Sequence, residues 1–94
     1  MALIISPKIQ EKLATRHNVK NNEVSQCFAN RTGKYLLDSR EEHASDPKTH
    51  WFISETDYGR KLKIVFVPKD RDIYLRSAFT PNENELRIYH KYGY

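Results

Sequence analysis

The chain has 94 residues, which is the length of a single domain with one hydrophobic core. Aromatic residues make up 12% of it, which argues against a disordered chain, and charged residues make up 30%. The formal net charge of +4 favours a polyanionic partner such as nucleic acid, an anionic membrane or an acidic protein. We therefore expect one domain, over residues 1–94, with a moderately basic surface.

The sequence predicts no disulfide and no membrane span. Its single cysteine, Cys27, excludes an intramolecular disulfide and a cysteine-rich zinc site. No apolar run approaches the length of a membrane span. The opening segment MALIISPKIQ lacks the basic leader and the cleavage site of a signal peptide. We expect a cytoplasmic protein that does not contact a membrane.

Two short helices are predicted first. Ser6 and Pro7 form a helix-start signal, because serine can cap free amides and proline is tolerated in the first turn. This helix should end near Asn18, since asparagine tolerates the left-handed conformation at a helix end. A second helix is expected from about residue 21 to residue 30. The apolar residues that define the two helical faces are Ile5, Ile9 and Leu13 in the first, and Val24, Cys27 and Phe28 in the second.

After Gly33 the spacing of apolar residues becomes typical of strands. Turn signals separate the runs, so we expect consecutive strands to pair as an antiparallel meander. The segment LKIVFV has apolar residues on both faces, the pattern of a central strand covered on both sides. The predicted strands are residues 34–39, 50–56, 61–67 and 73–79. In the last one, alternation places Arg76 on the same face as Tyr74 and Ala78, with Phe79 on the other.

A closing helix is predicted from the segment TPNE. Thr80 would cap it, Pro81 would occupy the first helical position, and Glu83 could reach back to the cap amide. Leu86 and Tyr89 would then point inward. The whole order predicts an α+β domain with two N-terminal helices, a four-stranded antiparallel meander and a C-terminal helix.

Several chemistries find little support in the sequence. His43, Asp46 and His50 are close together, but their spacing matches no standard metal-ligand pattern. The three glycines form no phosphate-binding loop, so no nucleotide cofactor is expected. Cys27 lies on a predicted buried stripe, which disfavours a role as a nucleophile. We predict no metal and no cofactor.

RNA cleavage without a metal is compatible with the side chains present. It requires a base for the 2′-hydroxyl proton, a cation for the phosphate and an acid for the leaving oxygen. The groups that could supply these roles are His17, Arg40, His50, Arg76 and Tyr89. Each of them could equally be a solvated surface residue or a packing residue, and Arg76 in particular could lie on the wet face of a strand.

Four sequence blocks, in order, carry a family resemblance over nearly the whole chain. They are RHNVKNNEVSQCF (16–28), LLDSREE (36–42), HWFISETDYGRKLKIVFV (50–67) and IYLRSAFTPNENELRIY (73–89). Together they resemble the BrnT-like ribonuclease toxins of bacterial type II toxin–antitoxin pairs. The resemblance implies a RelE-like compact α+β fold, metal-independent RNA cleavage, and a DNA-binding antitoxin as partner.

The resemblance also implies a set of site residues. His17, Arg40 and Tyr89 match the histidine, the first strand arginine and the closing tyrosine of the family. His50 stands where the family usually has arginine, and so does Phe79. The predicted catalytic set, expected to converge on one basic groove, is His17, Arg40, His50 and Tyr89. The predicted nucleic-acid-binding residues are Lys12, Arg16, Lys34, Arg60, Lys61 and Arg76.

Two other interpretations stay open. A non-catalytic module that binds nucleic acid or an acidic protein would have a basic face without a converging cluster, and its binding would weaken steeply with salt. A structural or interaction domain would carry the same basic surface incidentally. In any of these cases an edge strand of the sheet could pair with a second copy and form a homodimer.

Overall fold

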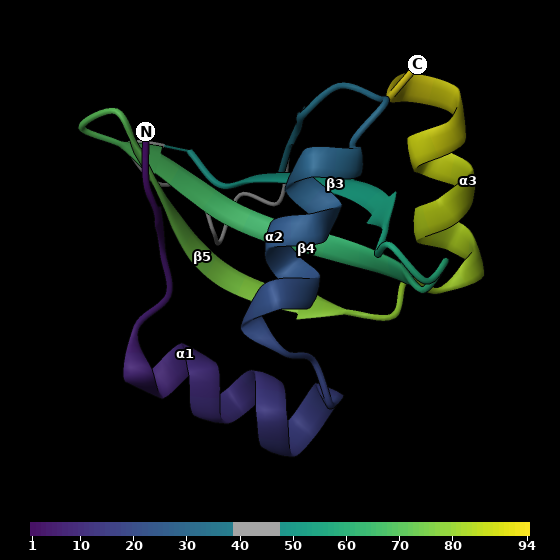
Figure 1. Cartoon of the computed structure of the whole chain (residues 1–94). Helices are drawn as coiled ribbons and strands as arrows, with labels where there is room; N and C mark the ends of the chain where they lie inside the picture. The colour runs from purple at the N-terminus through teal and green to yellow at the C-terminus, as the bar shows by residue number, and fades with distance from the viewer. Residues whose placement is uncertain (39–47) are drawn as a thin grey trace.

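A computed structural model describes residues 1–38 and 48–94 of the chain. The predicted catalytic Arg40, together with His43 and Asp46, lies outside the described residues. The elements in chain order are β1 (Leu3–Ile4), α1 (Pro7–Lys12), η1 (Leu13–His17), α2 (Asn21–Asn30), β2 (Leu36–Leu37), β3 (His50–Glu55), β4 (Lys61–Lys69), β5 (Asp72–Phe79) and α3 (Glu83–Tyr92). They form a compact α+β fold, as predicted, with helices before and after a mostly antiparallel sheet (Figure 1).

The described part of the sheet has five strands in the order β1-β5-β4-β3-β2. Strands β2 to β5 pair antiparallel, which confirms the meander, although β2 is shorter than the predicted strand over residues 34–39. The prediction of only four strands is wrong, because β1 adds a parallel strand beside β5, with Leu3 opposite Ile73. A strand of two residues is too short to produce a recognisable alternation, so the sequence pattern does not reveal it.

The first two helices begin and end close to where the sequence predicts. The Ser6 hydroxyl accepts a hydrogen bond from the Ile9 amide at 3.3 Å, and Pro7 occupies the first turn. Asn18 ends the helix with a left-handed φ of 52°. The last turn, η1, is π-helical rather than α-helical, with a bond from the Asn18 amide to the Leu13 carbonyl. Helix α2 then buries Val24 and Cys27, among the residues predicted for its apolar stripe.

The hairpin between β4 and β5 is tighter than predicted. Asp70 and Arg71 both have positive φ values, 52° and 69°, as a two-residue type I′ turn requires. Because the turn takes only these two residues, β4 extends through Pro68 to Lys69 instead of ending at Val67.

A β-bulge in β5 changes which side chains face the core. The ladder pairs Val65 with Ser77 but Phe66 with Leu75, so Arg76 has no partner on β4. An extra residue of this kind shifts the alternation of the strand that carries it.

The predicted faces of Ala78 and Phe79 are therefore wrong. Ala78 pairs with Ile64 and is fully buried. Phe79 pairs with Lys63 and lies on the same face of the sheet as Lys63, opposite to the face of Ala78. The alternation expected from an uninterrupted strand cannot reveal this shift.

The closing helix α3 starts two residues later than the segment TPNE suggests. Asn82, not Thr80, is the cap residue: its side chain accepts a hydrogen bond from the Glu85 amide at 2.8 Å. The Glu85 carboxylate in turn accepts one from the Asn82 amide at 3.0 Å, which completes a capping box. The same motif thus exists in the sequence, displaced by two positions.

The helices cover opposite faces of the sheet. On one face the Phe28 ring of α2 lies 4.8 Å from the Phe52 ring and 5.5 Å from the Phe66 ring. On the other face the Tyr89 ring of α3 lies 5.7 Å from the Trp51 ring. Figure 1 shows α2 lying across the sheet, with α1 below it and α3 standing at the right-hand side. The fully buried side chains of the described residues with the largest volumes are Phe52, Phe66, Leu13, Leu62, Ile64, Val24 and Cys27.

Candidate functional site

The described members of the predicted catalytic set lie in three different surroundings. The His17 ring is 5.6 Å from the Phe79 ring, on the face of the sheet that carries Lys63. The His50 ring is 5.7 Å from the Phe66 ring, which lies on the other face. Tyr89 is buried under α3. The structure therefore does not bring His17 and His50 together on one face.

The Tyr89 hydroxyl has a structural partner. It donates a hydrogen bond of 2.8 Å to the Lys34 carbonyl and so ties α3 to the segment before β2. Burial, together with the neighbouring Tyr94 hydroxyl, raises the pKa of Tyr89 to about 12. A phenol held in this way stays protonated and acts as a hydrogen-bond donor over the physiological range.

We expect the variant Tyr89→Phe to lose about 1–2 kcal/mol of unfolding free energy, because the Lys34 carbonyl would lose its donor. The folded pKa lies above the ordinary value of 10, so the hydroxyl stabilises the fold below pH 10 and loses this contribution as the pH rises toward 12. Urea titrations at several pH values measure both effects. Burial also raises the pKa of Cys27, so Cys27 likewise contributes a loss of stability as the pH rises. Because Cys27 is present in both proteins, its contribution cancels in the comparison. Equal stability of the two proteins at pH 7 would contradict a structural role for Tyr89.

The predicted RNA contact Arg60 connects three segments of the fold. Its guanidinium donates to the carbonyls of His17 at 3.1 Å and Asn18 at 2.8 Å, and pairs with the Glu23 carboxylate at 3.2 Å. Desolvation acts to raise the pKa of Glu23, but hydrogen bonds from the Lys20 amide and Arg60 outweigh it and lower the pKa. Arg60 thus holds the end of η1 beside the β3–β4 turn. Its proposed contact with RNA stays a prediction.

The fold brings together several of the predicted cations at the edge of β5. The Lys12 ammonium donates to the Arg76 carbonyl at 3.3 Å, although the two residues are 64 positions apart. Arg16 follows Lys12 by one turn and is exposed, as is Arg76 on its bulge. We refer to this surface as the basic edge; its members are Lys12, Arg16, His17, Arg76 and the ring of Phe79. It combines three cations, one imidazole and one aromatic ring.

Lys63 was not predicted, yet it lies beside the basic edge. Its ammonium group is 2.6 Å from the Glu85 carboxylate, 4.5 Å from the centre of the Trp51 ring and 5.6 Å from that of Phe79. The sequence offered a weak signal: Lys63 interrupts the apolar run of β4, which places a charge on the face opposite Leu62 and Ile64. A charge held by one carboxylate and two rings is well fixed in position.

The remaining predicted cations lie apart from the basic edge. The Lys34 amide donates to the Gly93 carbonyl at 2.6 Å, in the connection between α2 and β2. Lys61 opens β4 directly opposite Glu55 of β3. Because the alternation of β4 is regular, Lys61 and Lys63 project to the same face of the sheet.

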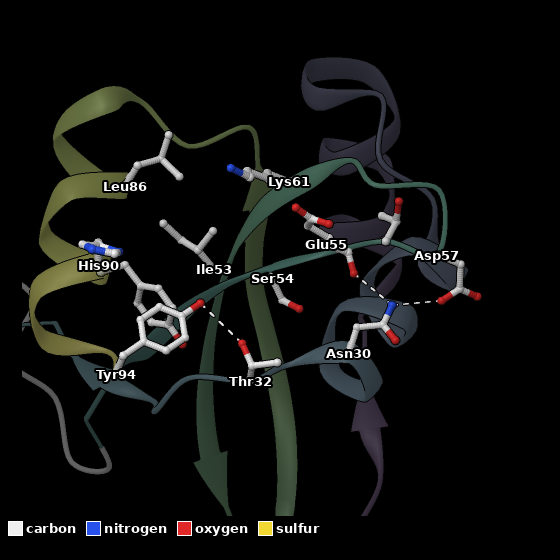
Figure 2. A pocket seen from close by; sticks show the side chains of 12 residues that line it. Asn30, Thr32, Ile53, Ser54, Glu55, Asp57, Lys61, Leu86, His90 and Tyr94 are labelled. Carbon is white, nitrogen blue, oxygen red and sulfur yellow. Dashed lines mark hydrogen bonds between the residues drawn. The ribbon is translucent and has the colours of Figure 1, made fainter.

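A polar pocket of about 710 Å³ lies beside α3 (Figure 2). Figure 2 shows His90 and Tyr94 at its left, on the α3 side, and Glu55 and Asp57 at the opposite side near Asn30. We call this hollow the α3 pocket. Its lining residues are Asn30, Thr32, Ile53, Ser54, Glu55, Thr56, Asp57, Lys61, Leu86, Tyr89, His90 and Tyr94.

Two predicted residues, Lys61 and Tyr89, line the α3 pocket, but its other polar groups were missed. Asn30 donates from its side chain to the Glu55 carbonyl at 3.0 Å and to the Asp57 carboxylate at 2.9 Å. The pocket is built from the end of α2, the end of β3 and the last turn of α3. No short motif connects these segments in the sequence, so only the fold reveals their proximity.

Within residues 1–38 and 48–94, no group of three or more His, Cys, Asp or Glu side chains is arranged to hold a metal ion. Among the helices described there, none has the length and apolar character needed to cross a bilayer. Comparison of the chain with protein-family models, with curated proteins and with solved structures found no match.

Proposed function

We propose that the protein binds RNA along the basic edge and cleaves it without a metal ion. The observation that carries this proposal is the contact of the first helical segment with β5, where the Lys12 ammonium group bonds the Arg76 carbonyl and the His17 ring lies beside the Phe79 ring. Lys12, His17 and Arg76 were selected from the sequence as RNA contacts or catalytic groups. These two contacts support a shared surface, because they join segments that are about sixty residues apart in the chain.

The chemistry of the basic edge fits phosphodiester cleavage. Histidine is the side chain best suited to take up a proton near neutral pH, so His17 serves as the base for the 2′-hydroxyl. The 2′-oxygen then attacks the phosphorus, the bond from phosphorus to the 5′-oxygen breaks, and the leaving 5′-oxygen takes its proton from water. Arg16, Arg76 and Lys12 supply positive charge for the phosphate as negative charge develops on it. The Phe79 ring, 5.6 Å from His17, offers a surface on which a base can stack.

The family resemblance extends this proposal to a biological setting. The protein would act in the cytoplasm as the toxin of a toxin–antitoxin pair, with a DNA-binding antitoxin as its partner. The presence of Phe79 in place of the family's arginine is compatible with this only if other cations hold the phosphate. Lys63, whose ammonium group lies 5.6 Å from the centre of the Phe79 ring, is the candidate for this role.

A second candidate function is binding without cleavage. The basic edge has one histidine, His17, whereas cleavage requires both a base and an acid, and this favours the simpler role of a basic module. Such a module would bind nucleic acid, or an acidic protein, through the same cations.

Cleavage and binding of a labelled RNA in the presence of EDTA test both candidates. We expect His17→Gln to slow cleavage by about 100-fold or more while binding is retained, because only the proton acceptor is removed. Arg76→Gln should weaken binding several-fold at low salt, with a smaller slope of log Kd against log salt concentration. Lys91→Gln, at an exposed position on α3, is the charge-matched control and should leave both activities unchanged.

Each outcome separates the candidates. Binding without cleavage by the wild-type protein would support the basic module, and no binding of RNA would exclude both RNA functions. Undiminished cleavage by His17→Gln would remove His17 from the proposed mechanism.

A further inference from the structure

We infer that the α3 pocket binds a guanine base of the RNA and that Glu55 selects it. This inference rests on the proposed RNA-binding function and adds a base preference to it. The pocket volume of about 710 Å³ falls in the range of small-molecule sites and is ample for one nucleotide.

The free carboxylate of Glu55 is the basis for the inference. Glu55 is exposed at the end of β3, and its carboxylate has no hydrogen-bond partner among the described residues. The Asn30 side chain donates a hydrogen bond to the backbone carbonyl of Glu55 and not to its carboxylate. By contrast, the Asp57 carboxylate already accepts a bond from Asn30. The pocket therefore presents one carboxylate that is free to accept two donors.

Only guanine matches such an acceptor on its Watson–Crick edge. An ionised carboxylate accepts hydrogen bonds and donates none. Guanine offers two adjacent donors, N1–H and the N2 amino group, whereas each of the other three bases places acceptors beside its donor. Single-stranded RNA is commonly recognised through these edges. Glu55 would accept hydrogen bonds from both guanine donors at once. With any other base, one carboxylate oxygen of Glu55 would face a hydrogen-bond acceptor of the base.

The opposite wall of the α3 pocket can hold the plane of the base. The Tyr94 side chain is 65% exposed, yet its ring is in edge contact with the Tyr89 ring at 5.5 Å. Its hydroxyl lies 3.4 Å from that of Thr32, which restrains the ring (Figure 2). An exposed but restrained aromatic ring is a suitable platform for stacking a base.

Lys61 in the lining favours a nucleotide over a cationic side chain of a partner protein, because its ammonium group can pair with a phosphate. Lys61 lies directly opposite Glu55 in the sheet, so a base held by Glu55 would have its phosphate near the Lys61 ammonium group. A lysine or arginine from a partner would meet this ammonium group, in a protein whose formal net charge is +4.

The α3 pocket and the basic edge are compatible with one bound RNA strand. Glu55 pairs with Lys61 and Phe79 pairs with Lys63, so Glu55 and Phe79 face the same side of the sheet with β4 between them. Neighbouring strands are about 4.8 Å apart, so β3 and β5, with β4 between them, are about 10 Å apart. RNA held at the basic edge can therefore reach the pocket with a nearby nucleotide.

Titration of the protein with GMP, AMP, CMP and UMP, followed by NMR shifts of the pocket residues, tests the inference. We expect GMP to bind about tenfold or more tightly than the others, in line with one bidentate contact. Glu55→Gln should abolish this preference, because the new amide presents one donor and one acceptor. Asp57→Asn is the matched control: the asparagine oxygen can still accept from Asn30, so the preference should remain.

The outcomes keep this inference separate from the proposed function. RNA binding by the wild-type protein with equal affinity for the four mononucleotides would overturn the guanine pocket alone. Failure to bind any RNA would instead overturn the proposed function. A preference for GMP that survives Glu55→Gln would remove Glu55 as the selecting group. Binding of a tri-arginine peptide in the pocket, with no shift caused by GMP, would show that the pocket serves a protein partner and would overturn the inference.

Discussion

Alanine at Gly33 is expected to remove about 3 kcal/mol or more of the free energy of unfolding, a large part of the stability of a small domain. A methyl group there would collide with the Tyr89 hydroxyl and would lie 2.8 Å from the Gly93 carbonyl. Neither group can move freely. The Tyr89 hydroxyl is bonded to the Lys34 carbonyl, and the Gly93 carbonyl to the Lys34 amide.

Gly59→Ala provides a matched control for this substitution. Gly59 has a φ of 84°, but nothing lies within 4 Å of the place where its methyl group would go. Gly59→Ala should therefore lose only about 1–2 kcal/mol of unfolding free energy, which is the cost of a left-handed backbone conformation for alanine. Urea unfolding of both variants gives the comparison. A smaller loss at Gly33 than at Gly59 would contradict the close packing around Tyr89.

The second large effect is expected for Phe52→Ala, with a loss of about 4 kcal/mol of unfolding free energy. Phe52 has 0% exposure, and its ring centre lies 4.8 Å from that of Phe28 and 5.5 Å from that of Tyr35. Removal of the ring leaves a cavity between the sheet and α2 that these neighbours cannot fill without moving.

Tyr58→Ala serves as the control for Phe52→Ala. Tyr58 is 95% exposed in the β3–β4 turn, so its removal should change stability by about 0.5 kcal/mol or less. The fluorescence of Trp51, the single tryptophan, reports unfolding of both variants. If Phe52→Ala were as stable as Tyr58→Ala, the assignment of Phe52 to the core would be wrong.

The sequence predicted the element order and most of the core, because these depend on local patterns. The spacing of Val24 and Cys27 identified the buried face of α2, and the apolar residues on both faces of the segment LKIVFV identified β4 as a central strand. The failures arise where a local pattern is too short or is interrupted. Strand β1 has too few residues to show alternation, and the bulge at Arg76 reverses the faces of the residues that follow it.

The candidate site was less predictable, because it depends on contacts between distant segments. The cations of the basic edge could be selected from the sequence, but not the meeting of Lys12 with Arg76. Glu55 and Tyr94 had no signal at all, since an exposed glutamate at a strand end and a tyrosine after a helix are ordinary surface residues. Their significance comes from the pocket that they share.

The parallel pairing of β1 with β5 has a consequence for the order of folding. The Ala2 amide donates to the Asp72 carboxylate, a contact that spans 70 residues of the chain. Contacts between such distant segments require extensive loop closure and slow the folding of small domains. During synthesis, helices α1 and α2 are available long before β5 leaves the ribosome, so Leu3 and Ile4 have no strand to join until then. Completion of the sheet, and with it the surface where Lys12 meets Arg76, is therefore expected to await synthesis of nearly the whole chain.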